Sequence, residues 1–264
     1  MSNVDHIAVK HDCARLLELL LDIAVCLVSS GSHTGKTIRI IQRFAKAYSF
    51  DVFIMLQSKC VSITVHSQKD LTVQYTAIRV IPHLAINFYL QSKLSALSWY
   101  VADNGLTLDQ LDAKFHEIIT TRRYPMYLIL LTTSLANMSF CRLFGGDFFS
   151  MLFVFLGTAC AFYVRELLKK MKLNHLFLVV ATAFISSFVS AFPELFGFGK
   201  TAHIALATSV LFIVPGVPLL NSIIEILDDH VLDGIETFMN CCVTIVCLAL
   251  GLLFTMLILG IENS

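Results

Sequence analysis

The sequence predicts an α+β soluble domain over residues 1–123, made of helices with a small antiparallel sheet, followed by an all-α membrane domain of five transmembrane helices over residues 124–264. Charge predicts the division, because the first part carries 13 Lys/Arg and 10 Asp/Glu, and the longer second part only 6 and 9. The second part also holds uncharged apolar stretches close to the roughly 20 residues that span a bilayer. We place the boundary at residues 121–125.

Helices open and close the soluble domain. Residues 12–28 form a long apolar-rich segment, and the polar run at 29–34 interrupts it before a second helix with one apolar face reaching Tyr48. Residues 84–102 predict a further helix ending at Asn104-Gly105, which favours a left-handed stop. Thr107 and Gln110 resemble a capping box that opens the last helix, to about residue 121.

Short alternating segments predict the sheet. Residues 51–56 and 60–66 are separated by three residues, and the second segment alternates apolar and polar side chains. This alternation is typical of half-buried antiparallel strands. Residues 71–77 predict a third strand.

Apolar stretches free of Asp, Glu, Lys and Arg predict the membrane helices. They cover residues 124–141, 148–164, 173–193, 201–224 and 237–261.

Positive charge near the helix ends predicts the orientation. The flanks on the side of the N-terminal domain hold Arg122, Arg123, Arg165, Lys169, Lys170 and Lys172. The opposite loops hold only Arg142 and Lys200. The excess of positive charge predicts that the N-terminal domain lies in the cytoplasm and Ser264 outside, and no export signal contradicts this orientation.

The eight cysteines show no C-x-x-C pair, so we interpret them as small hydrophobic residues in a reduced interior.

A near-match to a phosphate-binding loop lies at residues 30–37, SGSHTGKT. The first glycine of that motif is missing, and the preceding segment predicts a helix rather than the required strand. We therefore favour a helix N-terminus capped by Ser32 or Thr34, with Lys36 in solvent. A nucleotide-binding loop stays open as an alternative.

The strongest chemical signal lies at residues 214–236. Prolines and a glycine predict a break in the fourth membrane helix, of the kind at which many transporters bind substrate. Acidic residues from Glu225 to Glu236 follow at helical spacing, and those nearest the break are the costliest to place in a membrane. The candidate substrate and coupling residues are Pro215, Gly216, Pro218, Asn221, Glu225 and Asp228.

Other polar residues in the membrane part are weaker candidates for a solute path. They are Asn137, Ser190, His203 and His230. Small hydroxyl residues in membrane helices more often hold helices together than bind solutes.

The nine histidines lack the spacing of metal ligands, so we predict no metal site. We also predict no other cofactor and no nucleic-acid partner.

Two stretches resemble the bacterial threonine/serine exporter family, specifically the larger subunit of its split two-gene form. They are LVSSGSHTGKTIRIIQR at residues 27–43, followed by AKAY at 45–48, and VPGVPLLNSIIEILDDH at 214–230. The resemblance implies a non-enzymatic exporter subunit in the inner membrane, with proton-linked efflux of threonine and serine, or of C4-dicarboxylates such as succinate. A nucleotide-regulated or structural, non-transporting membrane protein is the alternative of another class.

The resemblance also implies that the chain is half of a transporter, completed by a small five-span membrane subunit. We expect that subunit to pack on small residues that allow close approach of helices. These residues are Thr132, Ser139, Gly157, Ser187 and Gly251. A homo-oligomer is the other possibility.

Overall fold

The computed structural model describes residues 3–57, 59–68, 73–82, 86–121, 124–171, 173–197 and 201–260. The chain divides into two compact units. The first comprises Met1–Arg122 and Val217–Phe238, and the second comprises Arg123–Gly216 and Met239–Ser264. The segment 217–238 therefore groups with the N-terminal residues, although the sequence suggested that it belongs to the membrane part. Of the charges used for orientation, Arg122, Arg123, Lys172 and Lys200 lie outside the described residues, as does Ser264.

A three-stranded antiparallel sheet organises the first unit. Its strands are β1 (Phe50–Gln57), β2 (Cys60–Ser67) and β3 (Gln74–Val80), with β2 in the centre. The alternation predicted on β2 is confirmed, because its Val and Ile side chains are buried and the residues between them are half-buried. The third strand begins three residues later than expected, and residues 71 and 72 lie outside the described part.

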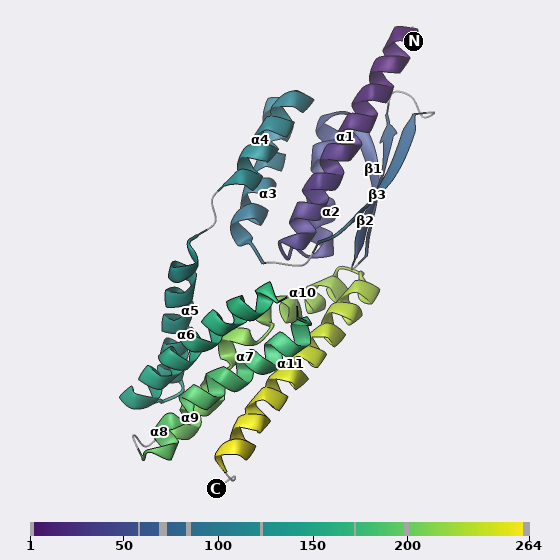
Figure 1. The fold of residues 1–264 in the computed structure, drawn as a ribbon. Helices are drawn as coiled ribbons and strands as arrows, with labels where there is room; N and C mark the ends of the chain where they lie inside the picture. Colours follow the sequence, from purple (N-terminus) through teal and green to yellow (C-terminus); the bar gives the residue numbers. More distant parts are fainter. Residues whose placement is uncertain are drawn as a thin grey trace. The chain divides into compact units, whose positions relative to one another are not determined.

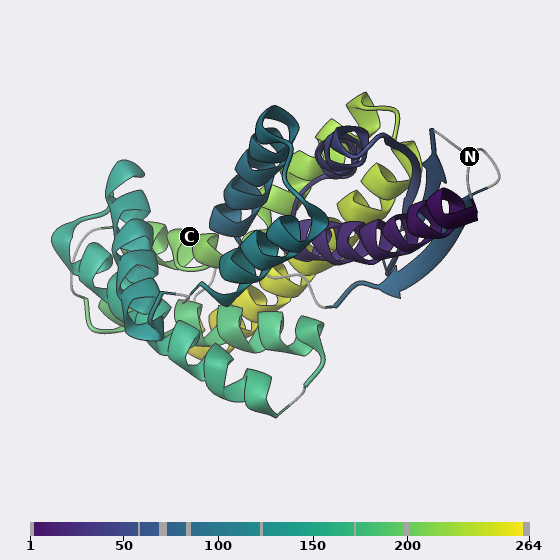
Figure 2. The same cartoon turned by 90° about the horizontal axis from the view of Figure 1, so that it is seen from above.

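Helices cover the sheet and close the core of the first unit. The long helix α1 (Asn3–Ser29) lies against the sheet in both ribbon views (Figures 1 and 2). Its buried positions Leu16, Leu20 and Leu27 repeat at helical spacing, which is why the sequence favours a helix there. The helix begins at Asn3 rather than at residue 12.

The remaining helices of the N-terminal region follow the predicted signals. They are α2 (Thr34–Ala47), α3 (Phe88–Asn104) and α4 (Leu108–Thr120). Gly105 ends α3 in the left-handed conformation with φ 63°, and Thr107 and Gln110 form the predicted capping box of α4.

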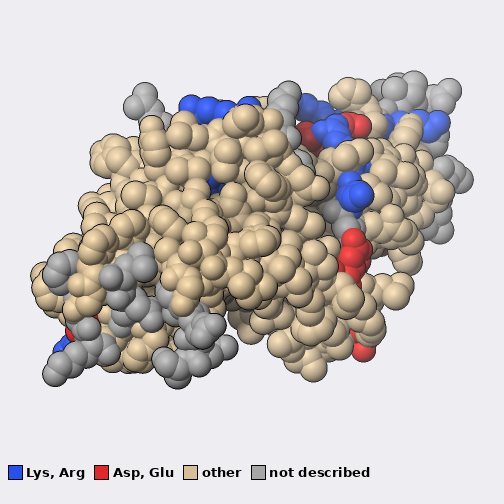
Figure 3. Space-filling view, turned by 60° about the horizontal axis from the view of Figure 1, so that its bottom comes forward, with Lys and Arg blue, Asp and Glu red and all other residues tan. Residues whose placement is uncertain are grey.

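The second unit is helical throughout its described residues. It contains α5 (Met126–Leu143), α6 (Phe148–Lys170), α7 (His175–Ser190), α8 (Phe192–Leu195), α9 (Ala202–Thr208) and the short 3-10 helix η1 (Leu211–Ile213). From Met239 it also includes α11 (Val231–Leu259). Helix α6 packs against both α5 and α7. Much of the face in Figure 3 carries neither basic nor acidic described side chains.

The prediction of five spanning helices is not confirmed. Within the described residues, α5, α6 and α11 are long and apolar enough to cross a membrane. A fourth span is present only if the broken segment from His203 to Leu227 counts as one. Helix α7 has 16 residues, which is short of the roughly 20 that a span requires. Leu253, Phe254 and Leu257 on α11 are about half exposed or more, as expected for a helix that faces lipid.

The predicted break in the fourth segment is confirmed. Helix η1 ends at Ile213, and α10 (Gly216–Leu227) begins after Pro215. Pro218 lies in the first turn of α10, where the missing backbone N–H costs no helical hydrogen bond.

Small residues mediate close packing inside the second unit. A Cβ at Gly251 would lie 2.6 Å from the Ala183 Cβ and 2.8 Å from the Val180 carbonyl oxygen. Gly157 and Ser187 are likewise buried within the unit. The expectation that these three residues face a partner subunit is therefore wrong, because the chain itself occupies them. Thr132 and Ser139 are exposed.

Replacing Gly251 by alanine is expected to destabilise the second unit by about 1 to 3 kcal/mol, the usual cost of overpacking a tight contact. Thermal unfolding of the full chain in mild detergent measures the effect. Gly216→Ala is the matched control, because no described atom lies within 4 Å of a Cβ placed there. Equal melting temperatures for the two variants would contradict the predicted close contact.

Candidate functional site

The start of α2 is held by its own side chains. His33, not Ser32 or Thr34, is the N-cap, and its Nδ1 accepts a hydrogen bond from the Lys36 N–H at 3.3 Å. Lys36 is not simply solvated, because its Nζ donates to Gln91 Oε1 at 3.1 Å. The loop follows helix α1 rather than a strand, so the strand–loop–helix context of a phosphate-binding loop is missing. The structural context therefore does not support the nucleotide-binding interpretation of this motif.

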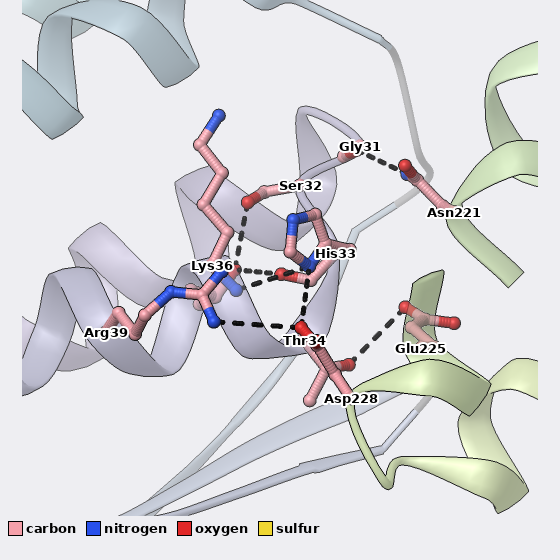
Figure 4. A network of polar contacts seen from close by, with 10 residues as sticks. Gly31, Ser32, His33, Thr34, Lys36, Arg39, Asn221, Glu225 and Asp228 are labelled. Carbon is pink, nitrogen blue, oxygen red and sulfur yellow. Dashed lines mark hydrogen bonds and ion pairs between the residues drawn. The ribbon is translucent and has the colours of Figure 1, made fainter. Parts of the chain in front are cut away.

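Helix α10 brings three predicted residues to this loop within the first unit (Figure 4). The Asn221 side-chain amide donates to the Gly31 carbonyl at 2.9 Å. Thr34 Oγ1 donates to Glu225 Oε1 at 3.4 Å. Asp228 Oδ2 lies 4.0 Å from His33 Nδ1 and 3.7 Å from Arg39 Nη1.

Glu225 is the most enclosed carboxylate of this site. Its residue is only 7% exposed, and Thr237 Oγ1 donates to its second oxygen, Oε2, at 3.3 Å. In the part of the chain that the structure describes, Glu225 forms no ion pair with Lys, Arg or His. Burying a charge without a cationic partner is costly, so this position suits a group that takes up a proton or a cation.

Gly35 permits the close approach of Asp228. A Cβ at Gly35 would collide with Asp228 Oδ2 and lie 3.3 Å from its carboxyl carbon. The Asp228 carboxylate therefore lies beside the first turn of α2, whose helix dipole and free N–H groups favour negative charge. The Asp228 side chain, directly after α10, occupies the position at which a phosphate-binding loop would hold an anion.

The local charges act on His33. Its burial and the nearby Arg39 lower the pKa of the His33 imidazole, and Asp228 opposes them. Lys36 and His230 add to the lowering. The neutral imidazole is the form that leaves Nδ1 free to accept the capping hydrogen bond.

The acidic residues beyond Glu225 do not share one helical face. The chain turns after α10, with Asp229 at φ 64°, and α11 begins at Val231. Asp233 is half-buried and Glu236 is exposed. The spacing predicted one continuous helix, but the turn at residues 228–230 interrupts it.

Of the weaker path candidates, His230 lies beside Glu225, because its backbone N–H donates to the Glu225 carbonyl at 2.8 Å. His203, which is exposed on α9, and Ser190 belong to the second unit. Ser190 on α7 is buried, and its hydroxyl donates to the Phe153 carbonyl at 3.4 Å. Pro215 and Gly216 lie at the helix break.

Asn137 is the centre of a buried polar cluster in the second unit. Its Nδ2 donates to Thr158 Oγ1 at 2.7 Å and to the Ser209 carbonyl at 3.2 Å, and Ser186 donates to the same carbonyl at 2.8 Å. Asn137 Oδ1 and Ser134 Oγ have no hydrogen-bond partner among the described residues. Unpaired polar atoms are costly in an apolar bundle, so this cluster suits water or a polar solute.

Several site residues were not singled out from the sequence as site residues. His33, Gly35 and Arg39 lie in the stretch that resembles a phosphate-binding loop, and Thr237 lies in α11. The signal was present, because residues 27–43 and 214–230 are the two stretches that carry the family resemblance. Their contact with each other was not predicted.

Apolar helices, a broken helix and a buried carboxylate on the helix that follows the break are together typical of membrane transporters. The chain belongs to the ThrE family, described as "Putative threonine/serine exporter", whose model matches residues 18–259. The family predicted from the two motifs is thereby confirmed.

Two curated relatives cover almost the whole chain. "Probable succinate transporter subunit YjjP" of Klebsiella aerogenes (strain ATCC 13048) is 23% identical over 256 residues, which cover 96% of this chain and 98% of the relative. The protein of the same name from Escherichia coli (strain K12) is 23% identical over 247 residues, covering 93% and 95%. No solved structure matches the chain significantly.

The lowered pKa of His33 predicts that the folded state is less stable in mild acid than at neutral pH. The unfolded chain binds a proton near the ordinary value of 6.5, before the folded chain does, so this contribution to stability is present above that pH and is lost as the pH falls. His33→Asn should lessen this pH dependence, because asparagine caps helices well and does not titrate. His33→Ala should cost about 1 kcal/mol at neutral pH.

Thermal unfolding of the full chain in detergent between pH 7.5 and pH 5.5 measures both effects. His116, which is exposed on α4, provides the control variant His116→Asn. Identical pH dependence of the wild type and His33→Asn would count against a role for His33 in acid lability.

Proposed function

We propose that this chain is one subunit of a secondary active exporter that moves small polar metabolites, threonine or serine, out of the cell in exchange for protons. The observation that carries the proposal is Glu225, a buried carboxylate contacted by two threonine hydroxyls and by no described cation. Membership of the ThrE family supports a transport role. The family is one of transporters, so we propose no enzymatic activity.

Glu225 has the chemistry required for coupling. The carboxylate binds either a proton or the ammonium group of an amino acid, and each neutralises the buried charge. The proton and the amino acid compete for one carboxylate, so binding of one displaces the other. This competition links proton entry to solute release. The Thr34 and Thr237 hydroxyls lie on either side of it and can satisfy its oxygens in both states.

A C4-dicarboxylate is the second candidate solute. Two curated relatives that cover the chain almost completely are named succinate transporter subunits. A dicarboxylate lacks an ammonium group, so it would require Glu225 to be protonated while it binds. The two candidates therefore differ in the state of one residue.

We place the protein in the bacterial inner membrane, with the N-terminal domain in the cytoplasm and the C-terminus outside. Arg165, Lys169 and Lys170 near the end of α6 support this orientation. The word "subunit" in the relatives' names supports a second membrane protein as partner, which we propose to be small and to have five spans. A homo-oligomer is the alternative assembly.

Glu225→Gln should reduce pH-driven efflux by about tenfold or more, which corresponds to a loss of about 1.4 kcal/mol. Glutamine keeps an acceptor for one threonine hydroxyl but carries no titratable group. The assay is efflux from proteoliposomes or intact cells under an imposed pH gradient, with insertion checked by membrane fractionation. Glu236→Gln, on an exposed residue of α11, is the matched control. Wild-type coupling in Glu225→Gln would refute the role of this carboxylate.

Radiolabelled threonine and succinate separate the candidate solutes. Efflux is measured in cells that lack their own exporters and express the chain with and without a candidate five-span partner subunit. We expect threonine or serine efflux that depends on the second subunit. Succinate efflux alone would replace the first candidate by the second. Full flux from a purified monomer of this chain would contradict the proposed partner.

A further inference from the structure

A basic groove lies on the first unit, outside the contacts of Glu225. It has a volume of about 450 Å³ and is lined by Arg39, Gln42, Arg43, Lys46, Ala47 and Ala102. No carboxylate is among its described lining residues. Helix α2, which supplies every lining residue except Ala102, contains four cations and neither Asp nor Glu. Its cations at positions 39, 43 and 46 are spaced by four and three residues, so they share one helical face.

Arg43 is held in a fixed position in this groove. Its Nη1 donates to Ser98 Oγ at 2.7 Å, and its guanidinium carbon lies 3.6 Å from the centre of the Trp99 ring. The Ser98 hydroxyl donates its own hydrogen to the Ser95 carbonyl, so it is oriented to accept from Arg43. Burial lowers the pKa of the Arg43 guanidinium. A guanidinium stacked and hydrogen-bonded in this way loses little freedom when an anion binds.

The positive charge of the groove is not neutralised within the described residues. Arg43 and Lys46 form no ion pair there, and Arg39 contacts only Asp228, at 3.7 Å with an arginine side chain that is 60% exposed. Three cations spaced by about one helical turn, about 5 Å, match two anionic groups a similar distance apart. Arginine adds a planar fork of donors that fits carboxylate and phosphate oxygens.

We infer that this groove is a binding site for a small dianion, a dicarboxylate or a phosphate group, supplied either as a free metabolite or as a lipid headgroup. The site is distinct from Glu225 and stands whether the exported solute is an amino acid or a dicarboxylate. Arg39 belongs to the groove and also contacts Asp228, the residue that follows α10. A bound dianion therefore competes with Asp228 for Arg39 and loosens α10 from α2, which makes the groove a regulatory site.

The only tryptophan of the chain reports on the groove, because Trp99 is stacked on Arg43. The experiment titrates the full chain in uncharged detergent with succinate and with inorganic phosphate at constant ionic strength, and follows tryptophan fluorescence. We expect a saturable change, with binding at least about tenfold weaker for acetate, which has one charge. Lys46→Gln should weaken binding by about tenfold without touching Trp99, and Lys93→Gln, beside Tyr89 on α3, should leave it unchanged.

A second experiment distinguishes a lipid headgroup from a free anion as the ligand. The chain in nanodiscs of phosphatidylcholine is compared with nanodiscs containing phosphatidic acid, whose phosphomonoester headgroup can carry two negative charges. A response only to phosphatidic acid that Lys46→Gln removes assigns the site to a headgroup, and saturable binding of succinate or phosphate assigns it to a free anion. Equilibrium dialysis with radiolabelled succinate and phosphate checks the fluorescence. Absence of binding in every arm, or equal binding in Lys46→Gln and the wild type, overturns the inference.

Asp228→Asn tests the link to α10. Removing the competing carboxylate should tighten dianion binding by about threefold, because Arg39 becomes available. Unchanged or weaker binding would remove Arg39 from the site and overturn its regulatory role. These measurements need no transport, so failure to bind a dianion is distinguishable from failure of the chain to export a solute.

Discussion

The contact between α10 and the start of α2 is the constraint on which the candidate site depends. Glu225 and Thr34, which form one of its hydrogen bonds, are 191 residues apart in the chain. The contact joins residues after the helix break to the N-terminal region, so that 217–238 forms part of the first unit. A change in the protonation or binding state of Glu225 therefore acts directly on Thr34, at the start of α2.

The charges of the contact between α10 and α2 explain why this contact can open and close. Asp228 is partly exposed and lies at the outer limit of pairing with Arg39, so water weakens their attraction. Glu225 is buried and pairs with two hydroxyls, which serve a charged or a neutral carboxyl group, as well as with the Thr34 backbone. A contact made of weak pairs and one buried titratable group can open at small cost in free energy.

Local signals predicted much of the fold. The capping box at Thr107, the left-handed stop at Gly105 and the alternation on β2 depend on neighbours in sequence, so they could be predicted. The number of spans could not, because apolar composition does not fix helix length: α7 is short, and the segment after α9 is broken. The N-cap was misassigned because histidine is an unusual cap, and its burial and the nearby Arg39, which lower its pKa, favour the neutral form.

The sequence by itself determined the class of protein, since uncharged apolar helices and the two family motifs are visible without coordinates. It also pointed to Asn221, Glu225 and Asp228, because a broken membrane helix followed by carboxylates is costly unless it is used. Only the tertiary structure decided their partners. Contact between segments 191 residues apart depends on how the chain folds back on itself, and neither composition nor spacing specifies which surfaces then meet.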